Sequence, residues 1–355
     1  MRLTGPVLVV GAGLLGTSIG LALRRHDVPV LLRDVNDENL KIASGLGAGE
    51  RDTGEADPEL VVVAVPPDHL AAEIAAALTR SDAVVTDVGS VKSAPLEAAR
   101  GLVGADALSR YVGGHPMAGS ERSGPFAASA SLFDGRPWAV APHDGAAPEA
   151  VALVTSLAET CHATPVRFTP AEHDQAVART SHLPHLLAAL AAGRLTDAPT
   201  AHLALSGQGV RDVTRIAAGD PDLWRQIVIA NAAALSGLLR DVRDDLDRLL
   251  GAVQAGEAAP IVSLLDRGVA GTAVIPGKHG GPPQPETALY VAVPDHPGEL
   301  ARLLSETGQT GVNVEDLRID HDPARPVGVV EITVAANRVE FLQQALEERG
   351  WTTHR

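Results

Sequence analysis

The sequence predicts an α/β protein in three parts: a doubly wound parallel sheet, an all-helical domain, and a small α+β domain. Short apolar runs alternate with amphipathic stretches over residues 1–168, as in sheets that helices cover on both faces. From 169 to 270 the apolar residues follow a helical period only. A linker rich in glycine and proline, 271–286, then precedes strands and helices in the order βαββα over 287–355.

Composition excludes several kinds of partner. At 355 residues, 45% of them hydrophobic, the chain is long enough for two or three domains with separate cores. Its formal net charge of -15 repels phosphate backbones and anionic membranes, so we expect no nucleic-acid or membrane partner. The one cysteine, Cys161, excludes an intramolecular disulfide, and the sequence shows no secretory signal. These features predict a cytoplasmic protein.

The chain opens with a strand and a glycine-rich turn. Val7 to Val10 are continuously apolar, as in a buried parallel strand, and glycines follow at G-x-G-x-x-G spacing before a helix. The N–H groups and positive dipole end of that helix can face a phosphate. We therefore predict a Rossmann-type dinucleotide-binding domain over 1–168. Its expected pyrophosphate contacts are the turn and the first helical residues: Gly11, Gly13, Leu14, Leu15 and Gly16.

The next strand, expected at 29–32, ends near a carboxylate. Asp34 lies about twenty residues past the glycines, where a carboxylate accepts hydrogen bonds from a ribose diol. This favours NAD over NADP. Arg33 leaves NADP open, because a neighbouring guanidinium can hold a 2′-phosphate. The alternative for the whole pattern is a glycine turn and a surface aspartate with no nucleotide.

Three further strands are expected at 60–65, 83–88 and 111–114, all ending at one edge of the sheet. Ligands bind at the carboxyl ends of the strands in an open parallel sheet. We therefore expect the residues at these ends to line the nucleotide crevice: Val65, Pro66, Gly89, Ser90 and His115. Strands at 138–141 and 166–168 complete the domain.

The helical domain should begin at Thr169, because Thr169-Pro170-Ala171-Glu172 has the pattern of a capping box with proline at the first helical position. That helix is expected to reach about residue 195 and to be kinked by Pro184. A single long helix is then expected over 224–249, with an apolar stripe too long for one subunit to cover. We therefore expect a homodimer formed through this domain, 169–270.

Several motifs together resemble a known family. They are the glycine-rich turn, DVGSVK at 87–92, GGHPMAGSE at 113–121, SHLPH at 181–185 and RDVTRIAAGDPDLW at 211–224. Over residues 6 to about 268 the chain is similar to the prephenate/arogenate dehydrogenase family. The resemblance implies NAD-dependent oxidative decarboxylation in tyrosine biosynthesis. The substrate is either prephenate, which gives 4-hydroxyphenylpyruvate, or arogenate, which gives tyrosine directly; the sequence does not distinguish them.

This reaction moves a hydride from C4 of a cyclohexadienol to nicotinamide while the ring carboxylate leaves as carbon dioxide. It needs a proton acceptor for the C4 hydroxyl, cations for the carboxylates and a dry pocket. His115 suits the first role, because an imidazole with a pKa of about 6.5 can be neutral, and by resemblance it is the catalytic histidine. By resemblance, Ser90 binds or orients the same hydroxyl. The alternatives are a core histidine and a helix-capping serine.

Arg211 and Arg215 lie four residues apart on one helical face, a fork suited to a dianionic substrate. The resemblance implies that Arg215 binds the carboxylate; a surface ion pair with Asp212 is the alternative. Glu121 matches a glutamate that gates the pocket by pairing with the arginine. One departure is Gly219, which stands where some relatives carry serine.

His182 and His185 lie three residues apart on the kinked helix. Two histidines at this spacing can bind a metal, but a third ligand at zinc-site spacing is not evident, and we predict no metal site. We expect both to contribute polarity to the substrate pocket. Trp224 is expected to wall that pocket by resemblance, and the alternative is a core tryptophan.

The C-terminal domain is expected to have the ferredoxin-like order, with 351–354 as a last strand. PDHPGELA at 294–301 and GVNVEDL at 311–317 resemble an ACT domain, a module that often binds amino acids. The turn before its first helix is expected to hold the carboxylate and ammonium of tyrosine or, less favourably, phenylalanine. That turn comprises Asp295, His296, Pro297 and Gly298.

Two rival functions remain open at this point. The first is another two-domain dehydrogenase that acts on a hydroxy acid, with His182 as its base. The second is a sensor without catalytic activity, in which nucleotide and amino-acid domains are joined for regulation. The combination of His115 with Arg215 argues against the sensor.

Overall fold

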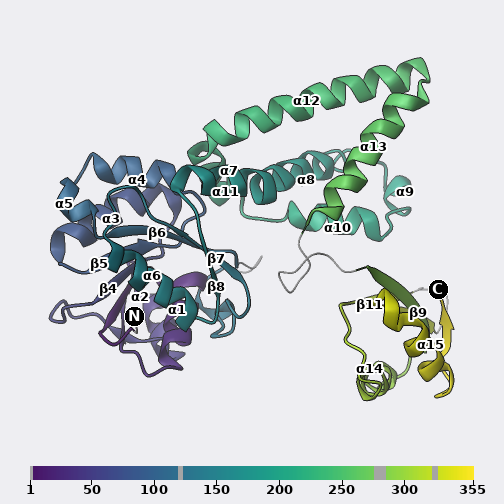
Figure 1. Cartoon of the computed structure of the whole chain (residues 1–355), viewed down its shortest axis with the longest axis horizontal. Helices are drawn as coiled ribbons and strands as arrows, with labels where there is room; N and C mark the ends of the chain where they lie inside the picture. Colours follow the sequence, from purple (N-terminus) through teal and green to yellow (C-terminus); the bar gives the residue numbers. More distant parts are fainter. Residues whose placement is uncertain (1–2, 119–122, 276–284, 322–326) are drawn as a thin grey trace. The chain divides into compact units, whose positions relative to one another are not determined.

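The computed structural model describes residues 3–118, 123–275, 285–321 and 327–355 (Figure 1). The chain divides into two compact units, Met1–Asp244 and Asp245–Arg355, which are described separately. None of the helices in the described part of the chain is both long and apolar enough to cross a membrane.

An eight-stranded sheet forms the centre of the first unit, in the order β3-β2-β1-β4-β5-β6-β7-β8 (Figure 1). The strands are β1 Val7–Val10, β2 Val30–Arg33, β3 Glu50–Arg51, β4 Leu60–Val63, β5 Val84–Asp87, β6 Tyr111–Pro116, β7 Pro137–Ala141 and β8 Thr164–Arg167. Pairing is parallel from β3 to β6, and β7 then runs antiparallel to β6. The predicted doubly wound sheet is confirmed. The short strand β3 and the reversal at β7 were not predicted.

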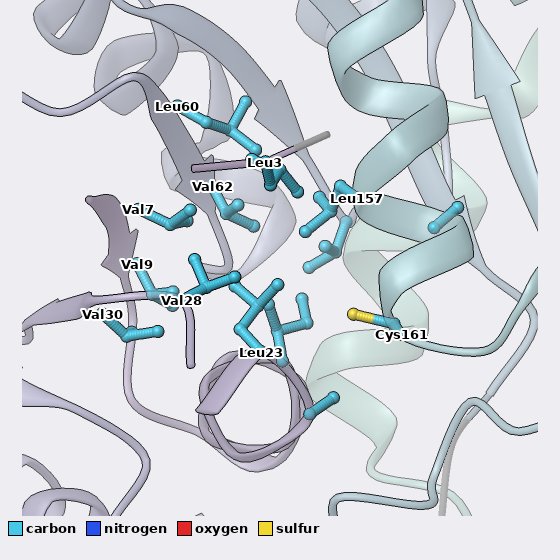
Figure 2. Close-up of a cluster of buried hydrophobic side chains, with 14 of the residues drawn as sticks. Leu3, Val7, Val9, Leu23, Val28, Val30, Leu60, Val62, Leu157 and Cys161 are labelled. Carbon is cyan, nitrogen blue, oxygen red and sulfur yellow. The ribbon is translucent and has the colours of Figure 1, made fainter. Parts of the chain in front are cut away.

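Separate apolar cores cover the two faces of this sheet. Figure 2 shows Val7, Val9 and Val62 directed towards Leu23 of α1, Leu14–Arg24, and Leu157 of α6, Pro148–Thr160. The other face of the same strands packs mainly against α3, Pro67–Arg80, and buries Leu8, Val10, Val61, Val63, Leu70 and Ile74. Burial of the strands on both faces explains why the apolar runs in the sequence are unbroken.

Shorter helices complete the part of the first unit that surrounds the sheet: α2 Asp37–Gly45, α4 Ser93–Arg100 and α5 Ala105–Leu108.

The helical part of the first unit begins with the predicted capping box. The Thr169 hydroxyl accepts from the Glu172 N–H at 3.2 Å, and the Glu172 carboxylate accepts from the Thr169 N–H at 2.9 Å. A π-helical turn, Ala178–His182, interrupts the predicted helix immediately before Pro184 and separates α7, Pro170–Val177, from α8, Leu183–Gly193. The remaining helices are α9 Thr200–Leu203, α10 Gln208–Ile216, α11 Pro221–Ala230 and α12 Ala232–Ala255.

The prediction of one continuous helix over 224–249 is wrong. Helix α11 ends at Ala230, and Asn231 has φ -106° and ψ 23° before α12 begins at Ala232. The cause is a side-chain contact: the Asn231 amide nitrogen donates to the Asp174 carbonyl oxygen at 2.9 Å and lies 3.0 Å from His182 Nδ1. The contact with Asp174 joins residues 57 positions apart, so the spacing of the apolar residues gave no sign of the break.

The second unit contains the end of α12, helix α13 and a four-stranded antiparallel sheet in the order β10-β11-β9-β12. Its elements are α13 Ala258–Ala273, β9 Glu286–Pro294, α14 Glu299–Gln309, β10 Asp316–His321, β11 Val327–Ala335, α15 Val339–Glu347 and β12 Thr352–His354. Leu289, Leu303 and Leu342 belong to its own apolar core. The ferredoxin-like order is confirmed, with β12 as the expected last strand.

Candidate active site

A cavity of about 590 Å³ lies in the first unit, at the carboxyl ends of β1, β4, β5 and β6. The glycine-rich turn, the end of β6, the π-helical turn and α11 all contribute to its wall. It brings together many of the predicted site residues: Gly13, Leu14, Leu15, Val65, Pro66, Gly89, Ser90, His115, His182 and Trp224.

Two glycines of the turn are required by close backbone contacts. A Cβ atom at Gly11, where φ is +103°, would lie 2.3 Å from the Ala64 carbonyl oxygen. A Cβ atom at Gly16 would lie 1.9 Å from the Gly11 carbonyl oxygen, so only glycine allows α1 to approach the turn. By contrast, the Cβ position of Gly13 has nothing within 4 Å. This arrangement leaves open space at the N-terminus of α1, which suits a pyrophosphate.

Asp34 and Arg33 have different surroundings. One carboxylate oxygen of Asp34 accepts from the Ala12 N–H of the glycine turn at 2.6 Å, and the other accepts from the Asn36 N–H at 2.7 Å. Each oxygen keeps a second lone pair for a ribose hydroxyl. The Arg33 guanidinium instead pairs with Asp52, with its Nε 3.0 Å from the carboxylate. Arg33 is thus the last residue of β2 and is held by Asp52, whereas Asp34 follows the strand and contacts the glycine turn.

His115 belongs to a chain of hydrogen-bonded side chains. Its Nδ1 lies 2.9 Å from Nε2 of His173, and Nδ1 of His173 lies 2.9 Å from Oδ1 of Asp174. His115 and His173 are 8% and 1% exposed, so His115 is the ring of the pair that lines the cavity. Burial above all holds the pKa of His115 well below its ordinary value, and electrostatic interactions with His173, Lys92 and His182 lower it further. His115 is therefore a neutral base at neutral pH.

Backbone groups hold the Asp174 carboxylate. It accepts from the Lys92 N–H and the Ser93 N–H, each at 2.8 Å, which ties α7 to the start of α4. Burial acts to raise the pKa of this carboxyl, but hydrogen bonds from His173, Ser93 and Lys92 outweigh it and lower the pKa. Asp174 is therefore ionised. It lies at one end of the hydrogen-bonded series of three side chains, and His115 lies at the other.

A buried charged cluster lies beneath the ends of β5 and β6. The Lys92 ammonium pairs with Asp87 and donates to the Gly114 carbonyl oxygen at 2.7 Å. Asp87 also accepts from the Tyr111 hydroxyl at 2.9 Å and from the Gly89 N–H at 3.0 Å. Burial lowers the pKa of Lys92 despite Asp87, and it raises the pKa of Tyr111 well above its ordinary value. The cluster fixes the strand ends that present Gly89 and His115.

The second wall of the cavity contains His182 and Trp224. The ring of His182 meets the Trp224 indole edge-on, with centroids 6.0 Å apart, and the ring of His185 stacks on the same indole. Burial lowers the pKa of His182 to about 4, partly opposed by the nearby Asp174. His185 also has a lowered pKa because of burial. Both rings are therefore neutral, polar groups at neutral pH.

The predicted cationic residues are not part of the described cavity wall. Arg211 and Arg215 are exposed on α10, and neither is among the described residues that line the cavity. Glu121 lies outside the described residues. In the part of the chain that the structure describes, no three histidine, cysteine, aspartate or glutamate side chains are grouped to hold a metal ion.

The predicted effector turn lies in the second unit, between β9 and α14. Gly298 has φ +94°, a left-handed conformation that favours glycine, at the N-terminus of α14. The His296 N–H donates to the Pro294 carbonyl oxygen at 2.8 Å and closes the turn.

Sequence reasoning missed the residues behind His115. His173 and Asp174 follow directly on the capping box, so their pattern indicates only the start of a helix. Lys92 and Asp87 stand within the DVGSVK motif, which was noted without a role for either residue. A lysine that is fully buried needs an acidic partner. Asp87 and Lys92, which follow an apolar run, were therefore the sequence signal that could have identified this buried pair.

Comparison with known proteins agrees with this geometry. Residues 19–167 match the family described as "Prephenate dehydrogenase, nucleotide-binding domain", and residues 169–267 match "Prephenate dehydrogenase, dimerization domain". A probable prephenate dehydrogenase of Streptomyces niveus, NovF, is 36% identical over 97% of this chain and 98% of its own length. The chain belongs to the prephenate dehydrogenase family. The predicted family is thus confirmed.

Solved structures of the prephenate dehydrogenase family share the fold. The prephenate dehydrogenase of Aquifex aeolicus, in complex with hydroxyphenyl propionate and NAD+, matches 78% of this chain and 99% of its own, at 27% identity and a TM-score of 0.68. The arogenate dehydrogenase of Synechocystis matches 75% of this chain and 98% of its own, at 27% identity and a TM-score of 0.64.

Proposed function

We propose that this chain catalyses the NAD-dependent oxidative decarboxylation of prephenate to 4-hydroxyphenylpyruvate. The observation that carries the proposal is the position of His115: a buried, neutral imidazole lines the same cavity as the glycine-rich turn. The relatives named prephenate dehydrogenase support the choice of substrate.

NAD is the cofactor, and it supplies a nicotinamide carbon that accepts a hydride. The glycine-rich turn and α1 hold its pyrophosphate, and Asp34 holds the adenosine ribose. The ion pair of Arg33 with Asp52 supports NAD over NADP, because that guanidinium already has a carboxylate partner. Val65, Pro66 and Gly89 line the cavity between the turn and His115.

His115 takes the proton of the C4 hydroxyl as the hydride leaves C4. The O–H bond breaks and an N–H bond forms. When the carboxylate leaves as carbon dioxide, the electrons of its C–C bond make the ring aromatic and return to the oxygen, which regains its proton from His115. The half-buried Ser90 hydroxyl at the end of β5 can donate to the same oxygen.

Arg215, with Arg211 one turn earlier on α10, binds the substrate carboxylates. His182, His185 and Trp224 form the pocket around the ring, with neutral polar groups and one aromatic face. These assignments follow the family motif in which each of these residues stands.

Arogenate is the second candidate substrate, because the arogenate dehydrogenase of Synechocystis shares this fold. The deciding experiment incubates the purified protein with NAD and either prephenate or arogenate, while reduced nicotinamide is followed. We expect turnover of prephenate, and loss of about 10²- to 10⁴-fold in kcat in His115→Asn with unchanged NAD affinity. Turnover of arogenate alone would contradict the substrate assignment, and a loss below tenfold would contradict the role of His115.

We also propose a homodimer formed through the helical region. On α12 and α13 many large apolar side chains are more than half exposed, more than a monomer usually leaves uncovered: Leu246, Leu250, Val253, Val262, Leu265 and Val269. The description of the matched family as a dimerization domain supports this assignment. Sedimentation at micromolar concentration should show a dimer, and a monomer would contradict the proposed homodimer.

The buried free thiol of Cys161 supports a cytoplasmic location.

A further inference from the structure

We infer that His173 and Asp174 set the tautomer of His115, so that Nε2 of His115 is the atom that accepts the substrate proton. The inference deepens the proposed function and rests on it for the identity of the proton donor. It follows from the order of donors and acceptors along the chain of three side chains.

Asp174 fixes the first proton. Its carboxylate meets two backbone N–H groups, those of Lys92 and Ser93, and peptide N–H groups can only donate. Both oxygens therefore act as acceptors, as an ionised carboxylate requires. The third contact, from Oδ1 to Nδ1 of His173 at 2.9 Å, is then an N–H donated by His173.

His173 passes this constraint to His115. We take the ring of His173 as neutral, so that with its single proton on Nδ1 it presents a lone pair at Nε2. The neighbour of that lone pair at 2.9 Å is Nδ1 of His115, which must therefore carry a hydrogen and donate it. A neutral imidazole has one N–H, so Nε2 of His115 is left unprotonated at the cavity.

The arrangement also stabilises the ring after proton transfer. When the hydroxyl O–H breaks and Nε2–H forms, His115 becomes an imidazolium with two N–H groups, and Nδ1–H still has its acceptor on His173. The negative charge of Asp174 lies behind His173 in a buried site, where charges are weakly screened. Proton return to the substrate oxygen restores the starting tautomer. His173 and Asp174 are thus positioning residues.

The titratable groups around His115 come from three elements. His173 and Asp174 lie on α7, Lys92 precedes α4, and His182 lies in the π-helical turn. Of these, only His173 contacts the His115 ring at hydrogen-bond distance in the described structure. The tautomer therefore depends on His173 more directly than on the other charges.

Two substitutions separate positioning from packing. His173→Phe keeps an aromatic ring but offers no acceptor to Nδ1 of His115, and kcat should fall on the order of 10²-fold with little change in the KM for NAD. His173→Gln provides a carbonyl oxygen that can accept the same hydrogen, and it should recover at least about tenfold of that loss. NAD titration and thermal melting verify that each variant is folded.

The chain offers a matched control. His26 and His162 form a second histidine pair, with ring centroids 5.1 Å apart and planes at 69°, the same values as for His115 and His173. This pair is exposed and lies outside the cavity. His26→Phe should therefore leave kcat unchanged within about twofold. A loss equal to that in His173→Phe would mean that the effect is not specific to the site, and would overturn the inference.

The tautomer is observable without substrate. In protein with ¹⁵N-labelled histidine, the resonances absent from His115→Asn belong to His115; Nδ1 should show the protonated shift and Nε2 the unprotonated shift. A proton on Nε2 in the wild-type enzyme, or a kcat in His173→Phe within threefold of wild type, would overturn the inference. If the spectrum is as expected but neither prephenate nor arogenate is consumed, the proposed function fails while the tautomer assignment stands.

Discussion

The imidazole of His185 stacks on the indole of Trp224, with ring centroids 3.5 Å apart and planes within 9°. The backbone of Gly219 makes this stack possible. A Cβ atom at Gly219 would lie 2.4 Å from Trp224 Nε1 and 3.1 Å from His185 Cε1. The indole therefore occupies the space that a larger residue at position 219 would need, which gives a physical reason for glycine at this position.

We accordingly predict that Gly219→Ser displaces Trp224 from His185. Overpacking of this kind typically costs about 1–3 kcal/mol, so substrate KM should rise about 5- to 100-fold, with a change in tryptophan fluorescence. Gly193→Ser is a suitable control, because nothing lies within 4 Å of that Cβ position. Unchanged fluorescence and KM in Gly219→Ser would show that the stack does not shape the substrate pocket.

The pH dependence of kcat/KM should report the buried state of His115. Protonation removes the base, and burial above all, with electrostatic interactions from the groups around the ring, holds the pKa of His115 well below 6.5. Activity should therefore persist as the pH falls through 6.5 and be lost only at lower pH. An acid limb with its midpoint at or above pH 6.5 would contradict this prediction.

Stability must be followed in the same titration. The unfolded chain binds protons on its histidines near pH 6.5, whereas His182 in the folded protein does so only near about 4. The contribution of this neutral ring to stability is therefore present above pH 6.5 and is lost as the pH falls from 6.5 towards 4. Melting curves at each pH distinguish unfolding from protonation of the base.

Substitution of Arg215 should act mainly on substrate binding. A charge-assisted hydrogen bond contributes about 1.5–3 kcal/mol, so Arg215→Ala should raise substrate KM about 10- to 100-fold, with a smaller change in kcat and none in the KM for NAD. Arg211→Ala is the matched variant, one helical turn away on α10. If Arg211→Ala raises KM and Arg215→Ala does not, the carboxylate is bound by Arg211.

Local patterns predicted most of the nucleotide-binding fold. Buried parallel strands such as β1 and β4 are unbroken apolar runs, and the close contacts of Gly11 and Gly16 leave a recognisable spacing. β3 has two exposed residues, Glu50 and Arg51, and therefore no apolar signal. The direction of β7 was not predictable, because an apolar run is the same in a parallel and an antiparallel strand.

The candidate site was predictable only in part, for a related reason. His115 follows an apolar strand, so its place at the cavity could be expected from the local sequence. His173 lies 58 residues further along the chain, and only the packing of α7 against the sheet brings the two rings together. Likewise, the break at Asn231 depends on its bond to Asp174, 57 residues away, which leaves the apolar period undisturbed.

The last prediction concerns the turn between β9 and α14, which we propose as a tyrosine site on the strength of its resemblance to an ACT domain. Asp295 can pair with an ammonium group, and the N–H groups at the start of α14 can donate hydrogen bonds to a carboxylate. If tyrosine binds there and favours one of two conformations, it should inhibit the full chain. Asp295→Ala, and a version ending at Val274, should then keep their basal activity and lose most of the inhibition.

Competition at the active site is the alternative explanation for inhibition by tyrosine. In that case the full chain, Asp295→Ala and the shortened version would be inhibited equally, and the inhibition would be overcome by raising the prephenate concentration. Binding by calorimetry separates the two sites further, because a regulatory site should bind tyrosine with the active site saturated by NAD and 4-hydroxyphenylpyruvate, the product of the proposed reaction. Failure to bind under those conditions would place tyrosine in the cavity and leave the C-terminal unit without a regulatory role.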